Sequence, residues 1–186
     1  VVEQALQAGV KLVQHRSKLT DDLPRYQEAV ALRDLCAAHG ALFIVNDRVD
    51  LALAVEADGV HLGQGDLPPA QARRLLGPDR LIGRSTHAPA QLQQAMADGC
   101  DYAGVGPLQA TPTKPGREPV GLDYLRQAAQ IATIPHYAIG GVDVQLLPAL
   151  LEAGGPHCRV AVVRAVMEAA DPAAAARQLL ELLADG

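Results

Sequence analysis

The sequence has no tryptophan, a single phenylalanine and an aromatic content of only 3%, although 49% of its 186 residues are hydrophobic. A core with so few rings must be built from aliphatic side chains that interlock between helices and strands. A chain of this length buries enough apolar surface to form one globular domain. We therefore expect one domain over residues 1–186.

Cysteine is also scarce, since Cys36, Cys100 and Cys158 are odd in number, widely spaced and include no CxxC pair. This usage argues against both a disulfide framework and a structural zinc site, and it is typical of a reducing compartment. We therefore predict a cytoplasmic protein. No apolar run approaches the roughly 18 to 20 residues of a membrane span. No basic segment followed by an apolar one opens the chain, so we expect neither a targeting signal nor a membrane partner.

The charge has no concentrated block of either sign, because the formal net charge of −5 is spread along the chain. A nucleic-acid groove or a surface for anionic membranes would need a basic patch. We therefore expect small soluble molecules as partners and no nucleic acid. The sequence is compatible with a homo-oligomer but does not determine the oligomeric state.

Short β-branched runs alternate with longer amphipathic stretches over the whole chain, which is typical of consecutive βα units and a parallel sheet. The strands are expected at residues 11–14, 42–45, 59–62, 81–83, 102–105, 136–139 and 160–163. The helices are expected at residues 21–39, 48–56, 69–76, 89–98, 122–131, 144–153 and 172–183, with Thr20 as the N-cap of the first and Gly40 as its stop.

Seven strands suit either an open doubly wound sheet or an eight-stranded barrel that lacks one strand. Residues 1–8 have helical character, and Gly9 then leads into the first strand, so the chain opens on a helix. A barrel with seven strands would leave two open edges. We therefore expect an α/β fold of the (β/α)8 TIM-barrel type, N-terminally incomplete, with its first strand missing from this chain.

In such a fold the active site lies at the carboxyl ends of the strands. The first strand ends in Gln14-His15-Arg16-Ser17-Lys18, where Gln14, Arg16 and Lys18 share one face through the two-residue strand period. Two cations and an amide on one face suit a polyanion. A solvated strand end followed by a charged loop is the alternative.

Carboxylates follow the next two strands, Asp47 directly after Asn46, and Asp66 on the neighbouring loop. Mg²⁺ usually keeps several waters and binds through one or two carboxylates plus substrate phosphate, so these two side chains predict one magnesium site. The alternative is that each caps the helix that follows. Ser85 supplies a hydroxyl at the fourth strand end, and His61 is expected to be hydrogen bonded rather than to ligate a metal.

A long Pro- and Gly-rich loop follows the fifth strand and carries Thr111, Thr113 and Lys114. Loops of this length in compact domains are usually functional, and a stiffened loop with two hydroxyls and an ammonium suits an anion clamp. Gly141 and Val163 stand after the last two strands, where free backbone N–H groups commonly bind phosphate. The glycines match neither GxGxxG nor a Walker loop, and no nucleophile elbow is present, which disfavours nucleotide cofactors and a covalent nucleophile.

Six motifs in this order resemble the thiamine phosphate synthase family: Gln14-x-Arg16-x-Lys18, Asn46-Asp47, His61-Leu62-Gly63-Gln64-x-Asp66, Gly104-Val105-Gly106-Pro107, Thr111-Pro112-Thr113-Lys114 and Ile139-Gly140-Gly141. The resemblance covers nearly the whole chain. It implies a (β/α)8 barrel that joins hydroxymethylpyrimidine diphosphate to a thiazole phosphate, giving thiamine phosphate and pyrophosphate.

The resemblance also implies residue roles. Asp47 and Asp66 would hold Mg²⁺. The catalytic and substrate-binding set would be Gln14 near the pyrimidine, Arg16, Lys18, Asn46 and Lys114 on the diphosphate, Ser85 near the pyrimidine or leaving group, and Thr111, Thr113, Gly141 and the Val163 backbone on the thiazole phosphate.

Two departures stand near the end: family members often have Ser where Arg164 stands, and residues 155–159 are about two residues longer than usual. Two alternatives remain, a thiazole tautomerase-like isomerase and a non-catalytic phosphate-binding paralogue. Lys114 together with Asp47 and Asp66 favours the synthase.

Overall fold

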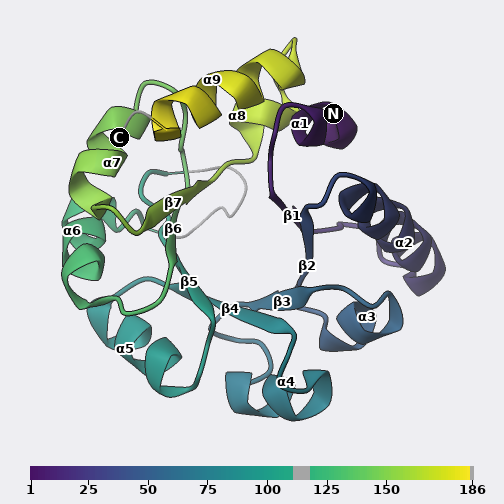
Figure 1. Ribbon diagram of the computed structural model, residues 1–186. Coiled ribbons are helices and arrows are strands. Elements are labelled where there is room, and N and C mark those ends of the chain that lie inside the picture. Colours follow the sequence, from purple (N-terminus) through teal and green to yellow (C-terminus); the bar gives the residue numbers. More distant parts are fainter. Residues whose placement is uncertain (111–117, 185–186) are drawn as a thin grey trace.

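The computed structural model describes residues 1–110 and 118–184. Seven strands form one parallel sheet in chain order, and helices lie on its outer side (Figure 1). The strands are β1 (Leu12–His15), β2 (Leu42–Asn46), β3 (Gly59–Leu62), β4 (Leu81–Thr86), β5 (Tyr102–Val105), β6 (His136–Ile139) and β7 (Cys158–Ala161).

A helix precedes β1 and further helices follow the strands. They are α1 (Val2–Gln7), α2 (Asp22–Ala38), α3 (Val49–Ala54), α4 (Pro69–Leu76), α5 (Pro89–Ala97), α6 (Gly121–Ile131), α7 (Leu147–Gly154), α8 (Arg164–Met167) and α9 (Pro172–Ala184). No helix in the described ranges is long and apolar enough to cross a membrane.

The sheet curls so that consecutive strands are always neighbours, from β1 beside β2 to β6 beside β7. Within the described ranges β1 and β7 form its two edges. This arrangement confirms the predicted fold class, a TIM-barrel type α/β fold. The expected strand before residue 1 and the single-domain boundary stay predictions.

Close packing between strands explains one glycine in the barrel wall. A Cβ atom at Gly83 would lie 2.1 Å from the ring of Tyr102, which belongs to the neighbouring strand. No side chain fits there, so the large tyrosine ring of β5 is paired with the smallest residue of β4. This fit places the Tyr102 hydroxyl beside His61 of β3, at 3.2 Å from its Nδ1 atom.

The amino-terminal edge of the sheet is held by two aspartates that precede strands. Asp58 accepts a hydrogen bond from the Phe43 amide at 2.7 Å, and Asp101 accepts one from the Ile82 amide, also at 2.7 Å. Arg73 of α4 adds an ion pair to Asp101 at 2.6 Å. These bonds stabilise the barrel at the end opposite the carboxyl ends of the strands.

Most predicted elements are confirmed, and β3, β5, β6 and α4 have the predicted bounds. The last strand was placed wrongly: it is Cys158–Ala161 rather than 160–163, because pairing with β6 starts at Cys158. The helix expected at 144–153 begins only at Leu147, after a turn in which Asp143 accepts from the Leu146 amide. The short helix α8 was not expected.

Thr20 is not the N-cap of α2. Asp21 occupies that position with extended backbone angles, and Thr20 instead donates to the Asp21 carboxylate at 3.3 Å. The stop at Gly40 is confirmed, since α2 ends at Ala38 and Gly40 has a positive φ of 59°.

Candidate functional site

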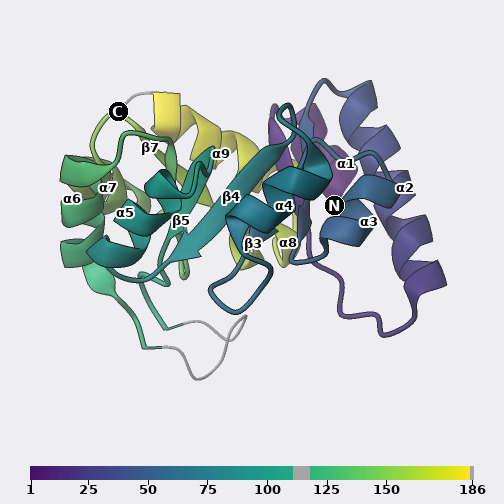
Figure 2. The same cartoon turned by 90° about the horizontal axis from the view of Figure 1, so that it is seen from below.

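Two cavities open at the carboxyl ends of the strands. The first, about 460 Å³, lies at the ends of β1 and β2. The second, about 340 Å³, lies at the ends of β4 to β7. The loops that follow β1 and β3 lie at one edge of the sheet in Figure 2. Both cavities therefore lie at the end of the fold where β/α barrels carry their active sites.

The first cavity brings together side chains from two adjacent strand ends. It is lined by His15, Arg16, Ser17, Lys18, Arg25, Val45, Asn46, Asp47, Arg48 and Leu51. Four cations and a single carboxylate give this cavity the charge and the hydrogen-bond donors that suit a polyanion. The sequence predicted Arg16, Lys18, Asn46 and Asp47 here, whereas Gln14, an exposed residue of β1, lines neither cavity.

His15 anchors the start of this cavity. Its ring is buried and lies 2.8 Å from the carboxylate of Glu28 on α2, and that hydrogen bond holds the pKa of Glu28 below its usual range. The end of β1 is thereby tied to the helix behind it. Arg16, the next residue, is exposed at the rim.

Asp47 has an unusual backbone at the end of β2. Its φ is 64°, in the left-handed region that non-glycine residues rarely adopt, and its amide donates to the carbonyl of His61 at 2.8 Å. Helix α3 begins at Val49 with Arg48 at the N-cap, so the helix-cap alternative for Asp47 is wrong. Such strain in a polar residue at a strand end is typical of functional sites.

Asp66 folds back on its own loop. Its Oδ2 atom accepts from the Gly63 amide at 2.6 Å, and the N-cap of α4 is Pro68, so Asp66 is not a helix cap either. It does not line the first cavity, although β3 is the neighbour of β2. Its pairing with Asp47 on one cation stays a prediction.

No group of three or more His, Cys, Asp or Glu side chains within residues 1–110 and 118–184 is arranged as a metal site. Magnesium needs no such group, because one or two carboxylates and substrate phosphate oxygens suffice. Asp47, in a cavity with an amide and several cations, has donor chemistry that fits Mg²⁺ bound together with a phosphorylated ligand.

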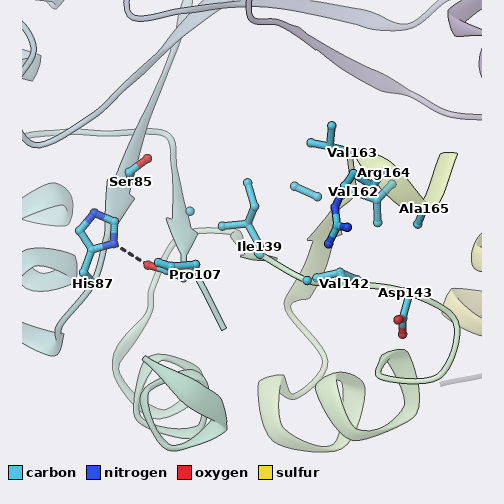
Figure 3. Close-up of a pocket in the computed structure, with 15 residues that line it drawn as sticks. Ser85, His87, Pro107, Ile139, Val142, Asp143, Val162, Val163, Arg164 and Ala165 are labelled. Carbon is cyan, nitrogen blue, oxygen red and sulfur yellow. Dashed lines mark hydrogen bonds between the residues drawn. The ribbon is translucent and has the colours of Figure 1, made fainter. Parts of the chain in front are cut away.

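The second cavity is formed by four consecutive strand ends (Figure 3). Its lining residues are Ser85, His87, Gly104, Gly106, Pro107, Ile139, Gly140, Gly141, Val142, Asp143, Ala161, Val162, Val163, Arg164 and Ala165. Ser85, Gly141 and Val163 were predicted, and Arg164, where family members often have Ser, also lines the cavity. Thr111, Thr113 and Lys114 lie outside the described residues.

Ser85 is held by a buried hydrogen-bond network. Its Oγ atom lies 2.9 Å from His61 Nε2, and Tyr102 OH lies 3.2 Å from His61 Nδ1. Burial raises the pKa of Tyr102, so the phenol stays protonated and can donate to Nδ1. A neutral histidine donates from one ring nitrogen and accepts at the other, so His61 holds both hydroxyls at once and fixes the position of Ser85 at the cavity wall. The expectation that His61 is hydrogen bonded is confirmed.

The glycine turn after β6 brings backbone against backbone. Gly140 and Gly141 have φ values of 96° and 74°, and a Cβ on Gly140 would lie 2.6 Å from Pro107. The Leu108 amide donates to the Ile139 carbonyl at 2.9 Å, which ties this turn to the loop after β5. This conformation lets the chain follow the cavity wall closely, as a phosphate-binding turn requires.

Several lining residues were missed in the sequence. His87, whose Nδ1 atom is hydrogen bonded to the Gly106 carbonyl (Figure 3), stands two residues after Ser85, so the strand period was a usable signal. Asp143 lies in the turn before α7. Arg25 and Arg48 line the first cavity from α2 and the start of α3, and no strand-end pattern points to them.

Comparison with known proteins agrees with this geometry. A family model described as thiamine monophosphate synthase matches residues 1–166. Thiamine-phosphate synthases of Prochlorococcus marinus and Gloeobacter violaceus are each 56% identical, over 98% and 100% of this chain and 51% and 54% of their own lengths. The chain thus spans about half the length of the curated relatives it matches.

Solved structures of similar architecture include a protein of the same family. A thiamine phosphate pyrophosphorylase from Pyrococcus furiosus superposes with a TM-score of 0.90 at 35% identity, covering 99% of this chain and 88% of that one. A 3-hexulose-6-phosphate synthase, with a TM-score of 0.67 and 22% identity, shares the fold alone. The match over residues 1–166 and the shared architecture show that this chain belongs to the thiamine monophosphate synthase family.

Proposed function

We propose that this protein is a Mg²⁺-dependent transferase that joins hydroxymethylpyrimidine diphosphate to thiazole phosphate, giving thiamine phosphate and pyrophosphate. The observation that carries the proposal is the pair of cavities at one end of the barrel, one rich in cations and one built on a glycine turn. Two phosphorylated substrates need two anion sites that open toward each other.

The cation-rich cavity would take the diphosphate. Arg16, Lys18 and Asn46 line it, and guanidinium, ammonium and amide groups all donate to phosphate oxygens. Asp47 and Asp66 would hold Mg²⁺, which when bound would neutralise charge on the diphosphate. Gln14 would lie near the pyrimidine ring, a role that rests on the sequence motif alone.

The second cavity would take the thiazole phosphate, since Gly141 and Val163 line it. The family resemblance alone implies that Thr111 and Thr113 would complete the monophosphate site and that Lys114 would bind the diphosphate. Support comes from the positive φ of Gly141 and from the start of α8 directly after Val163.

The reaction makes modest demands on the protein. The bond between the pyrimidine methylene carbon and the diphosphate oxygen breaks, and its electron pair leaves with the diphosphate. The thiazole nitrogen then supplies the pair for the new carbon–nitrogen bond. That nitrogen carries no proton, so no general base is needed, and Arg16 and Lys18 serve chiefly to neutralise the departing charge. Ser85 would orient the pyrimidine or the leaving group.

Cys36, Cys100 and Cys158 are buried and free, in keeping with a reducing cytoplasm. A thiazole tautomerase-like isomerase would need only the monophosphate site, so the gathering of Arg16, Lys18 and Asp47 in one cavity favours the synthase.

The test is pyrophosphate release with both substrates, with either one omitted, and with Mg²⁺ removed by a chelator. Release that needs both substrates and the metal would support the synthase. Conversion of the thiazole phosphate alone, without pyrophosphate, would point to the isomerase. Binding of both phosphorylated compounds without any turnover would identify a non-catalytic paralogue, and either of these results would overturn the proposal.

A further inference from the structure

The first cavity is lined by residues of two separate loops. The relative position of these loops determines which side chains can contact one ligand at the same time. The loop after β1 carries Arg16 and Lys18, and the loop after β2 carries Asp47. A diphosphate with its metal must meet the two cations and the carboxylate at once. Backbone pairing between β1 and β2 ends at His15 and Val45, before either loop begins.

Arg25 fastens the first loop to helix α2. Its guanidinium donates to the carbonyl of Thr20 at 3.1 Å and to the carbonyl of Leu19. Only 15% of its side chain is exposed, although it stands in the first turns of a surface helix. Two carbonyls at the end of the cation-bearing loop are thus fixed by one planar group.

Asp22 connects this arrangement to the second loop. Its Oδ1 atom accepts from Arg25 Nη1 at 2.8 Å and from Arg48 Nη1 at 3.3 Å. Arg48 follows Asp47 directly in the chain. Its guanidinium also donates to Asp50, from Nε to Oδ1 at 2.8 Å and from Nη2 to Oδ2 at 2.6 Å. A continuous chain of polar contacts therefore runs from one loop to the other.

We propose that Arg25, Asp22 and Arg48 are positioning residues that fix the spacing between the two phosphate-binding cations and the metal-binding carboxylate. The inference deepens the proposed function and rests on it. We name the set the Asp22 bridge. The bridge acts at the cavity rather than on the fold as a whole, because Asp22 is 79% exposed and ion pairs at such exposure contribute little to global stability.

The Asp22 bridge and a purely electrostatic explanation predict opposite effects of Asp22→Ala on anion binding. Asp22 does not line the cavity, yet it places a negative charge beside two of its cations. If only charge mattered, Asp22→Ala would make the cavity more positive and would strengthen anion binding. If Asp22 positions the loops, the same substitution weakens binding, because a misplaced group loses its directional contacts.

The experiment measures binding of inorganic pyrophosphate with Mg²⁺ by calorimetry in the wild-type protein and in Asp22→Ala. We expect binding to weaken about tenfold, with an unchanged melting temperature. In steady-state kinetics, KM for the pyrimidine diphosphate should rise while KM for the thiazole phosphate stays constant. Arg25→Lys keeps the positive charge but loses the planar guanidinium that donates to two carbonyls. It should also weaken pyrophosphate binding, and it provides the test if Asp22→Ala folds poorly.

Asp34→Ala is the matched control, since Asp34 is an exposed acid of the same helix that pairs only with its neighbour Arg33 among the contacts of the described chain. It should leave binding and both KM values unchanged. Unaltered or tighter pyrophosphate binding in Asp22→Ala would overturn the bridge, as would equal effects on both KM values. A wild-type protein that binds pyrophosphate but joins no substrates would instead refute the proposed function and leave the bridge standing.

Discussion

His61 Nε2 lies 2.9 Å from Ser85 Oγ, and this contact joins a buried residue of β3 to the wall of the second cavity. Ser85 touches the cavity, while His61 and Tyr102 stand behind it. A free hydroxyl has many orientations in water, and the hydrogen bond to His61 restricts those of the Ser85 hydroxyl. The relationship makes His61 a positioning residue for Ser85.

We expect His61→Phe to lower kcat about tenfold to a hundredfold, by leaving the Ser85 hydroxyl without its partner. If His61 acts only through Ser85, the double variant His61→Phe/Ser85→Ala should lose no more activity than Ser85→Ala alone. Steady-state kinetics of the three variants checks this. Fully additive losses would show that His61 acts independently of Ser85.

Asp47 combines backbone strain with a proposed metal role, and two substitutions separate these properties. Asp47→Ala and Asp47→Gly should both abolish Mg²⁺-dependent pyrophosphate release. Glycine accepts the φ of 64° without cost, whereas alanine does not, so the glycine variant should be more stable than the alanine variant by about 1 kcal/mol. Urea unfolding measures the difference.

Glu56 provides the control for Asp47. Its φ is 54°, and it follows the end of α3, where glycine is the usual residue. Glu56→Gly should therefore leave pyrophosphate release unchanged and should not destabilise the protein. Near-normal turnover in Asp47→Ala would remove the metal assignment, whatever the stability results.

Alternating short and long apolar patterns were enough to predict the parallel sheet, because parallel strands buried on both faces form continuous apolar runs. The choice of a barrel over an open sheet needed the helix at the start of the chain and the family resemblance. The strands β3 and β5, buried at every position, have the predicted bounds for this reason. The bounds of β7 were wrong because the prediction followed the apolar run at 160–163. The strand instead begins at Cys158, where its pairing with β6 starts, and its residues are only partly buried. The short helix α8 has too few residues to show a period.

The candidate site was predictable only where strands end. Arg16, Lys18, Asn46 and Asp47 were found because carboxyl ends of parallel strands meet at one edge. Arg25 and Arg48 were not, since a guanidinium on a helix can face solvent or cavity with equal ease. Their direction depends on tertiary contacts with Asp22 and with loop carbonyls, which no local pattern records.

His136 makes the stability of the fold sensitive to acid. It is buried at the start of β6, its Nε2 atom lies 3.2 Å from the Gly154 carbonyl, and burial lowers its pKa below that of an exposed histidine. The folded state therefore favours the neutral ring. Stability is fully present above the unfolded pKa of about 6.5 and falls as the pH drops through it, until the lowered folded pKa is reached.

The prediction is a decline in the free energy of unfolding between about pH 7 and the lowered pKa, measured by urea titration. Replacing the ionisable ring in His136→Gln should flatten this decline. His39→Gln, at the half-exposed C-cap of α2, is the control and should retain the full pH dependence. An equally steep decline in both variants would assign the acid sensitivity to other groups.

Asp101 should be among the most costly polar residues to remove. Its carboxylate accepts from the Ile82 amide at 2.7 Å and pairs with Arg73 at 2.6 Å, and these bonds tie α4, β4 and β5 together. Asp101→Ala removes the acceptor of the Ile82 amide and the charged partner of Arg73, whose guanidinium keeps only carbonyl acceptors such as that of Arg80. We expect a loss of about 2 to 3 kcal/mol in the free energy of unfolding. Asp101→Asn, which keeps an acceptor oxygen for the amide, should lose less.

Because Asp101 lies at the barrel end opposite the cavities, neither variant should change the KM of the folded enzyme. A rise in KM would mean that the amino-terminal edge of the sheet is coupled to the site.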